Sequence, residues 1–127
     1  MLRSTFIKKY KIIALRAFIC SEKARREGLL ALEEEFSDRT KYMQRDIFDY
    51  GMKFVIDGTD AVVIEQILNN IINQEKNKKK KILKTIQKEA ALSIQRGDNP
   101  RILLAYMNSY TDIDISGDEV IQEFLKS

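Results

Sequence analysis

The chain has 127 residues, the usual size of one domain, and its 44% hydrophobic and 32% charged content suits helices with one buried and one solvated face. Lysine and arginine exceed aspartate and glutamate by 22 − 19, and this net charge of +3 is too weak to indicate nucleic-acid binding by itself. The sequence has no histidine and one cysteine, which excludes imidazole catalysis, histidine-anchored zinc sites and an intramolecular disulfide.

A long first helix is predicted from Thr5 to about Glu35, because this stretch contains one glycine and no proline. An apolar row repeats in it at alternating steps of four and three: Phe6, Tyr10, Ile13, Ala17, Cys20 and Ala24. A second row, Ile12, Leu15 and Ile19, predicts packing against more than one neighbour. We expect Ser4 to cap the helix, Cys20 to be a small core residue, and Gly28 to allow a close helix approach.

A shorter second helix is predicted from the apolar residues between Tyr42 and Ile56, after a polar break at 37–40. In the segment DGTD that follows, Gly58 can adopt the left-handed conformation that ends a helix, and Asp60 can cap the next one. A third helix begins at Ala61 and can continue through the lysine run KNKKKK at 76–81 as far as Ile94.

The segment Gly97–Pro100 is the clearest helix boundary, with glycine to end one helix, Asn99 to cap the next and proline at its first position. A fourth helix is predicted from Arg101 to Tyr110, and a short last one from Gly117 to Lys126. Charges interrupt every apolar stretch before it reaches the roughly 20 residues that a membrane helix needs. The sequence therefore predicts one all-α domain over residues 1–127, a compact bundle of about four to five helices, two of them long, without a transmembrane segment.

Two stretches of the chain are informative when taken together. The first is ARREGLLALEEE, Ala24–Glu35, followed by RDIFDYGMKFVIDGTD, Arg45–Asp60, and the second is EAALSIQRGDNPRILLAYMNSY, Glu89–Tyr110. In this order they resemble the MotA family of flagellar stator proteins. The first is similar to the large cytoplasmic loop of that family, and the second to its cytoplasmic segment after the fourth membrane helix. The resemblance implies a cytoplasmic domain at the inner face of the membrane, near the flagellar motor.

The sequence departs from this family where its members carry their membrane helices. Between Gln74 and Ile82 it has only the lysine run, and the first two membrane helices are absent upstream of Phe6. The chain would then be a natural soluble relative or the product of a designed joining of loops. The resemblance implies no ion conduction, because the proton path belongs to the missing segments, and a monomer or weak oligomer, because MotA rings assemble largely through those helices.

The family also implies a partner. In MotA an arginine and a glutamate eight residues later face the rotor protein FliG, and these fall on Arg25 and Glu33, with Arg26 beside the first. On one continuous helix this spacing would put both charges on one face, about 12 Å apart. The expected function is a non-catalytic stator-like or accessory role in motility, with a FliG-like partner and no cofactor.

Other readings remain open for several segments. The basic residues Lys76, Lys78, Lys79, Lys80 and Lys81 form a solvated helix face or bind anionic lipid headgroups, which would make the chain a peripheral membrane-binding module. A soluble regulatory paralogue of the stator is a third alternative.

The residues Asp112, Asp114, Ser116, Gly117 and Glu123 match the spacing of a calcium-binding loop, although Ser116 and Glu119 also have the spacing of a capping box. Catalysis has no candidate residues, since the consecutive carboxylates Glu33–Glu35 point in different directions.

Overall fold

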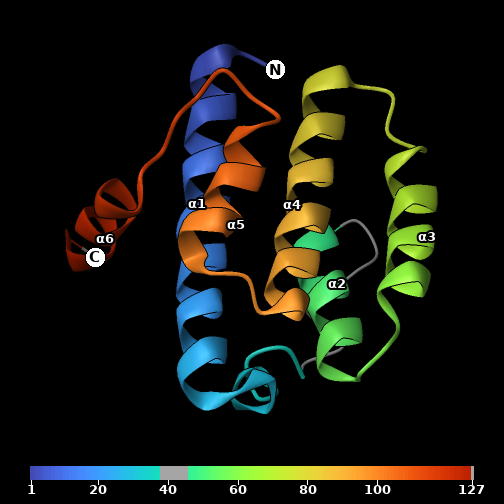
Figure 1. Ribbon diagram of the computed structural model, residues 1–127. Coiled ribbons are helices and arrows are strands. Elements are labelled where there is room, and N and C mark those ends of the chain that lie inside the picture. Colours follow the sequence, from blue (N-terminus) through green and yellow to red (C-terminus); the bar gives the residue numbers. More distant parts are fainter. Residues whose placement is uncertain (38–45, 127) are drawn as a thin grey trace.

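The computed structural model describes residues 1–37 and 46–126, and every regular element in these ranges is a helix (Figure 1). The elements are α1 (Arg3–Glu27), the 3-10 helix η1 (Leu29–Leu32), α2 (Ile47–Ile56), α3 (Ala61–Ile72), α4 (Lys78–Arg96), α5 (Pro100–Asn108) and α6 (Gly117–Lys126). The predicted all-α fold is confirmed. None of the helices in the described ranges is long and apolar enough to span a bilayer.

Helix α4 is the centre of the bundle and contacts α1, α2, α3 and α5. Helices α1, α2 and α4 run in one direction, α3 and α5 run in the other, and α6 packs against the outer side of α1 (Figure 1). The start of α1, the α3–α4 connection and the start of α4 therefore lie at one end of the bundle. The end of α1, η1 and the α2–α3 turn lie at the opposite end (Figure 1).

The prediction that the third helix continues through the lysine run is wrong. Helix α3 ends at Ile72, and α4 begins at Lys78 and runs back beside it. The Asn77 side chain caps α4 by accepting a hydrogen bond of 3.0 Å from the backbone N–H of Lys80. The Glu75 carboxylate accepts a hydrogen bond of 3.1 Å from the Asn77 N–H and pairs with Lys84 at 3.1 Å. The two long helices are thus α1 and α4.

The first helix is shorter than predicted. It ends at Glu27 because Gly28 has φ 90° and ψ 161°, outside the helical region. Nothing lies within 4 Å of where a Gly28 Cβ would be, so the backbone conformation, and not the expected close packing, explains this glycine. At the other end Ser4 lies within α1, whose cap position is occupied by Leu2 without a side-chain hydrogen bond.

The predicted second apolar row of α1 is only partly buried. Leu15 is half-buried and contacts the core, but Ile19 lies at the surface and Ile12 is 64% exposed. The first row is confirmed, since its members are buried or partly buried in the core. Helix α1 thus keeps part of an apolar face that the described helices do not cover.

The predicted turns around Gly58 and Gly97 are confirmed, since both glycines have positive φ values, 78° and 74°. Asn99 accepts a hydrogen bond of 2.8 Å from the Arg101 N–H, and Pro100 occupies the first position of α5. Asp60 precedes α3 but makes no side-chain capping bond. Tyr42 and most of the polar break before it lie outside the described residues.

Helix α2 lies very close to α4 and α3. A Cβ atom on Gly51 would lie 3.1 Å from the Ala91 Cβ and 3.1 Å from the Leu68 Cδ1. Both of these neighbours are fully buried, as is Ala90 beside them. The spacing of the three helices therefore depends on a residue without a side chain at this position.

We predict that Gly51→Ala lowers the free energy of unfolding by about 1–3 kcal/mol, because the new methyl group overpacks the contact with Ala91 and Leu68. Helix propensity alone predicts the opposite sign, a gain of about 1 kcal/mol. Urea denaturation decides between the two, with Asn70→Ala on the exposed side of α3 as the control for propensity. A Gly51→Ala variant as stable as the parent would show that the helices can move apart without cost.

Candidate functional site

The charges expected to face a partner lie at the end of the bundle opposite the lysine run (Figure 1). Arg25 and Arg26 are in the last turn of α1, Glu33 directly follows η1, and all three side chains are exposed. The expectation that Arg25 and Glu33 share one helix face is wrong, because the chain leaves the α-helix at Gly28 and continues as a 3-10 helix. The two charges are carried by separate elements.

Arg25 also has a structural contact that the sequence did not indicate. Its Nη1 atom donates a hydrogen bond of 2.8 Å to the carbonyl oxygen of Gly97, directly after α4. A cation is favourable here, because the unpaired carbonyl groups at a helix C-terminus carry partial negative charge. Arg26 instead makes a long hydrogen bond of 3.4 Å to the Glu22 carbonyl within its own helix.

Leu30 is a surface residue that the sequence did not identify. It lies on η1 between the two arginines and Glu33 and is 72% exposed, whereas its neighbour Leu32 is fully buried. The predicted first helix extended to about Glu35 and included both leucines, so the prediction did not separate them. We call Arg25, Arg26, Leu30 and Glu33 the η1 end.

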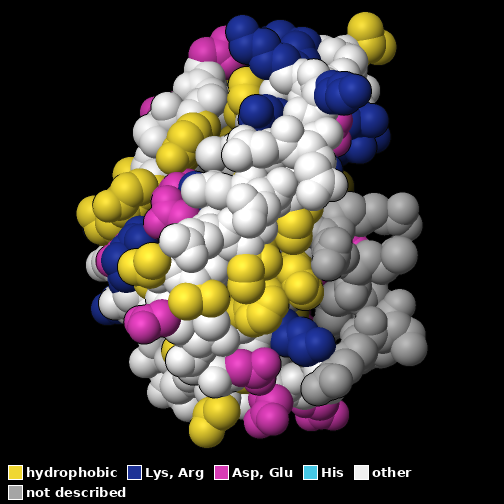
Figure 2. Space-filling view, turned by 90° about the vertical axis from the view of Figure 1, so that its right-hand side faces the viewer, with side chains coloured by type: hydrophobic (Ala, Val, Ile, Leu, Met, Phe, Trp, Pro, Cys, Tyr) yellow, Lys and Arg dark blue, Asp and Glu magenta, His cyan; other side chains and the backbone are white. Residues whose placement is uncertain are grey.

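The lysine run occupies the connection before α4 and the first turn of that helix. Lys76, Lys78, Lys79 and Lys80 are exposed and Lys81 is half-buried. Figure 2 shows lysine and arginine side chains gathered at this end of the molecule. Cations at a helix N-terminus oppose the helix dipole. Glu75 offsets part of this charge, and its pKa is lowered by the Asn77 backbone N–H and by Lys84.

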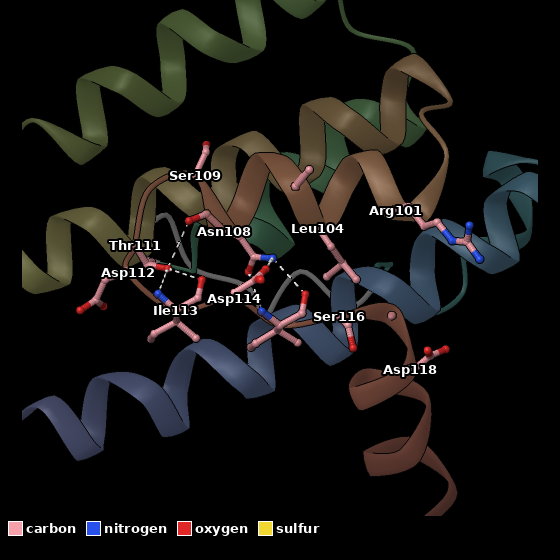
Figure 3. Close-up of a pocket in the computed structure, with 13 residues that line it drawn as sticks. Arg101, Leu104, Asn108, Ser109, Thr111, Asp112, Ile113, Asp114, Ser116 and Asp118 are labelled. Carbon is pink, nitrogen blue, oxygen red and sulfur yellow. Dashed lines mark hydrogen bonds between the residues drawn. The ribbon is translucent and has the colours of Figure 1, made fainter.

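An open hollow of about 680 Å³ lies between α5 and the segment that leads to α6 (Figure 3). Its polar groups hold this segment in place. The Asn108 amide donates to the Asp114 carboxylate at 3.3 Å and to the Ile115 carbonyl at 2.9 Å. Asn108 also accepts a hydrogen bond of 2.5 Å from the Tyr10 hydroxyl, whose pKa is raised by burial and by the charge of Asp114.

The calcium-loop alternative has no support in this geometry. Asp112 pairs with Arg3 at 3.0 Å, which lowers the pKa of its carboxyl group, and Asp112, Asp114 and Asp118 are directed differently in Figure 3. Ser116 instead accepts a hydrogen bond of 3.2 Å from the Glu119 N–H, as the capping-box reading requires. Within the described ranges no group of three or more His, Cys, Asp or Glu side chains could hold a metal ion.

Cys20 is buried, as expected for a small core residue. Burial, with a smaller contribution from the charge of Glu35, raises the pKa of its thiol to about 12. The thiol is therefore protonated at physiological pH and is a poor nucleophile.

Comparison with known proteins gives one similarity. No protein-family model matches the chain, and no solved structure matches it. Over 83 residues the chain is 32% identical to Motility protein A of Treponema phagedenis, and the match covers 65% of this chain. The chain spans only 30% of the length of that relative. The similarity indicates a MotA-like relationship.

We predict that Arg25→Ala lowers the free energy of unfolding by about 0.5–1 kcal/mol, because it removes a charged hydrogen bond to the end of α4. The matched variant Arg26→Ala should change it by less than about 0.5 kcal/mol, since Arg26 bonds only within its own helix. Urea denaturation of the two variants provides the comparison. Equal effects would contradict a structural role for Arg25.

We also expect Cys20 to react slowly with iodoacetamide at pH 8 in the folded chain and rapidly in the unfolded chain. The reason is that folding both buries the thiol and keeps it protonated. Guanidinium at about 6 M unfolds even very stable domains and provides the unfolded state. Mass spectrometry of timed samples gives both rates. Comparable rates in the two conditions would mean that the α1 core opens readily.

Proposed function

We propose that this chain is a non-catalytic, stator-like component of a flagellar motor and that its η1 end contacts a FliG-like rotor protein from the cytoplasmic side. The observation that carries the proposal is the similarity to Motility protein A. It is supported by two segments that lie at opposite ends of the bundle: the start of α1 with the α3–α4 connection, and the η1 end.

The first of these segments is defined by the resemblance to the MotA family. Members of that family carry membrane helices upstream of the region that corresponds to α1 and between the regions that correspond to α3 and α4. In this chain the start of α1 and the α3–α4 connection lie at the same end of the bundle (Figure 1). This arrangement supports an orientation in which that end faces the membrane.

The second segment is the η1 end, which lies at the far end of α1. A helix of 25 residues is about 37 Å long, so the η1 end would project well away from a membrane at the other end. Such a position suits residues that meet a partner in the cytoplasm.

The chemistry of the η1 end suits a contact that is made and broken repeatedly. Exposed charges contribute little affinity, roughly 0–1 kcal/mol for a surface pair, but they steer a partner and set its orientation. Leu30 adds an exposed apolar side chain among these charges, and removing it from water on association favours binding.

We expect the charge reversals Arg26→Glu and Glu33→Lys each to weaken binding to the FliG-like protein of the same organism about tenfold, or about 1.4 kcal/mol. Both side chains are exposed, so the fold should remain intact. Biolayer interferometry at low and high salt measures the effect, and circular dichroism checks the fold. Arg25 is a poorer probe because its reversal also removes the bond to Gly97.

The matched controls are Lys126→Glu and Glu123→Lys, which make the same charge changes on α6. They should bind the rotor protein like the parent chain. A complementary reversal on the rotor side should restore binding to Arg26→Glu. If both η1-end variants bind as well as the α6 variants, the assignment of the rotor contact to this end has to be given up.

A further inference from the structure

The fold joins the lysine run to a part of α1 that the sequence alone did not connect with it. A groove of about 320 Å³ runs between the first halves of α1 and α4. Its lining includes the aliphatic residues Ile12, Ile13 and Leu83 and the basic residues Lys9, Lys80 and Lys84. We call this surface the α1–α4 groove.

The groove combines positive charge with exposed aliphatic side chains. Ile12, the most exposed of its aliphatic residues, is 64% exposed. Of the three lysines in the lining, Lys84 is paired with Glu75, Lys80 belongs to the lysine run, and Lys9 adds the charge of α1 beside it. At the same end Arg3 and Asp112 form an ion pair, so they add no net charge.

We propose that the α1–α4 groove and the lysine run dock on the surface of an anionic phospholipid bilayer. The lysines would contact lipid phosphates, and Ile12 would enter the boundary between headgroups and acyl chains. Surfaces that combine lysines with exposed aliphatic residues bind in this way, through the sum of apolar burial and attraction to anionic lipids. A lysine side chain can also bury its methylene groups while its ammonium group stays among the headgroups.

The composition of the groove favours a bilayer over a nucleic acid. Proteins that bind single strands stack bases on aromatic rings. Among the described residues, the side chains that line the groove are aliphatic, basic or amide groups and the thioether of Met1, without an aromatic ring. An aliphatic floor between basic residues complements an acyl chain below a phosphate group.

This inference goes beyond the rotor contact and does not depend on it, because no residue of the η1 end lines the groove. The groove runs along the sides of α1 and α4, from Lys9 to Ile13 and from Lys80 to Gln87, and Arg26, Leu30 and Glu33 lie outside it. A failure of lipid binding would therefore not affect the rotor assay, and the reverse also holds.

The test is sedimentation of the purified chain with vesicles of phosphatidylglycerol and phosphatidylcholine in equal parts, compared with vesicles of phosphatidylcholine alone. We expect binding to the anionic vesicles only, with at least about a tenfold loss at high salt. The double variant Lys9→Gln/Lys80→Gln should bind about 25-fold more weakly, since each basic residue contributes about fivefold. The matched double variant Arg101→Gln/Lys126→Gln makes the same charge change on α5 and α6 and should stay within about twofold of the parent.

The apolar part of the proposal has its own comparison. Ile12→Ser should weaken binding several-fold, and this loss should persist at high salt. Val62→Ser removes a similarly exposed residue, 67% exposed at the start of α3, and should have no effect. The proposal is overturned if the chain does not bind anionic vesicles or binds phosphatidylcholine vesicles equally well. It is also overturned if the groove double variant and its matched control lose equal affinity, or if Ile12→Ser and Val62→Ser bind equally.

Discussion

The close contact between α2 and α4 determines where both surfaces of the molecule lie. Gly51 lets α2 approach Ala91 on α4, and α4 also contacts α1, α3 and α5. A helix held on so many sides cannot tilt without disturbing the whole core. The same helix begins with the lysine run and ends next to the carbonyl group that Arg25 binds. With 19 residues it spans about 28 Å, so it keeps the basic end and the η1 end at a fixed distance.

Much of the fold follows from local signals in the sequence. The turns at Gly58 and at Gly97–Pro100 were predicted because glycine, asparagine and proline each act on the backbone within a few residues. The break between α3 and α4 was missed, since isoleucine and leucine continue on both sides of it and neither glycine nor proline marks it. The end of α1 was missed for another reason. Gly28 was recognised, but its positive φ becomes necessary only when η1 folds back to bury Leu32.

The sequence identified many residues of the candidate surfaces, but it did not show how these residues are arranged in space. The resemblance to MotA pointed to Arg25 and Glu33, with Arg26 beside them, and the charge distribution identified the lysine run; all of these except the half-buried Lys81 are exposed. It could not reveal that Arg25 bonds to Gly97 or that Leu30 is exposed beside Glu33. The apolar row with Ile12 was expected to be buried, because periodicity shows which residues share a helix face and not whether a neighbour covers that face. Only the tertiary structure places Ile12 beside Lys80 and Lys84.

The two proposed contacts would support each other physically. The η1 end offers two arginines, one glutamate and one exposed leucine, which is too little surface for a tight complex in solution. A chain held at a membrane by its basic end is confined to a thin layer, and confinement raises the effective concentration of whatever the free end meets there. A weak contact can then be occupied for much of the time and still break quickly, because the gain comes from geometry and leaves the dissociation rate of the contact unchanged. The groove and the η1 end share no residue, so one contact does not use the side chains of the other, and the central helix α4 keeps the two surfaces in a fixed arrangement.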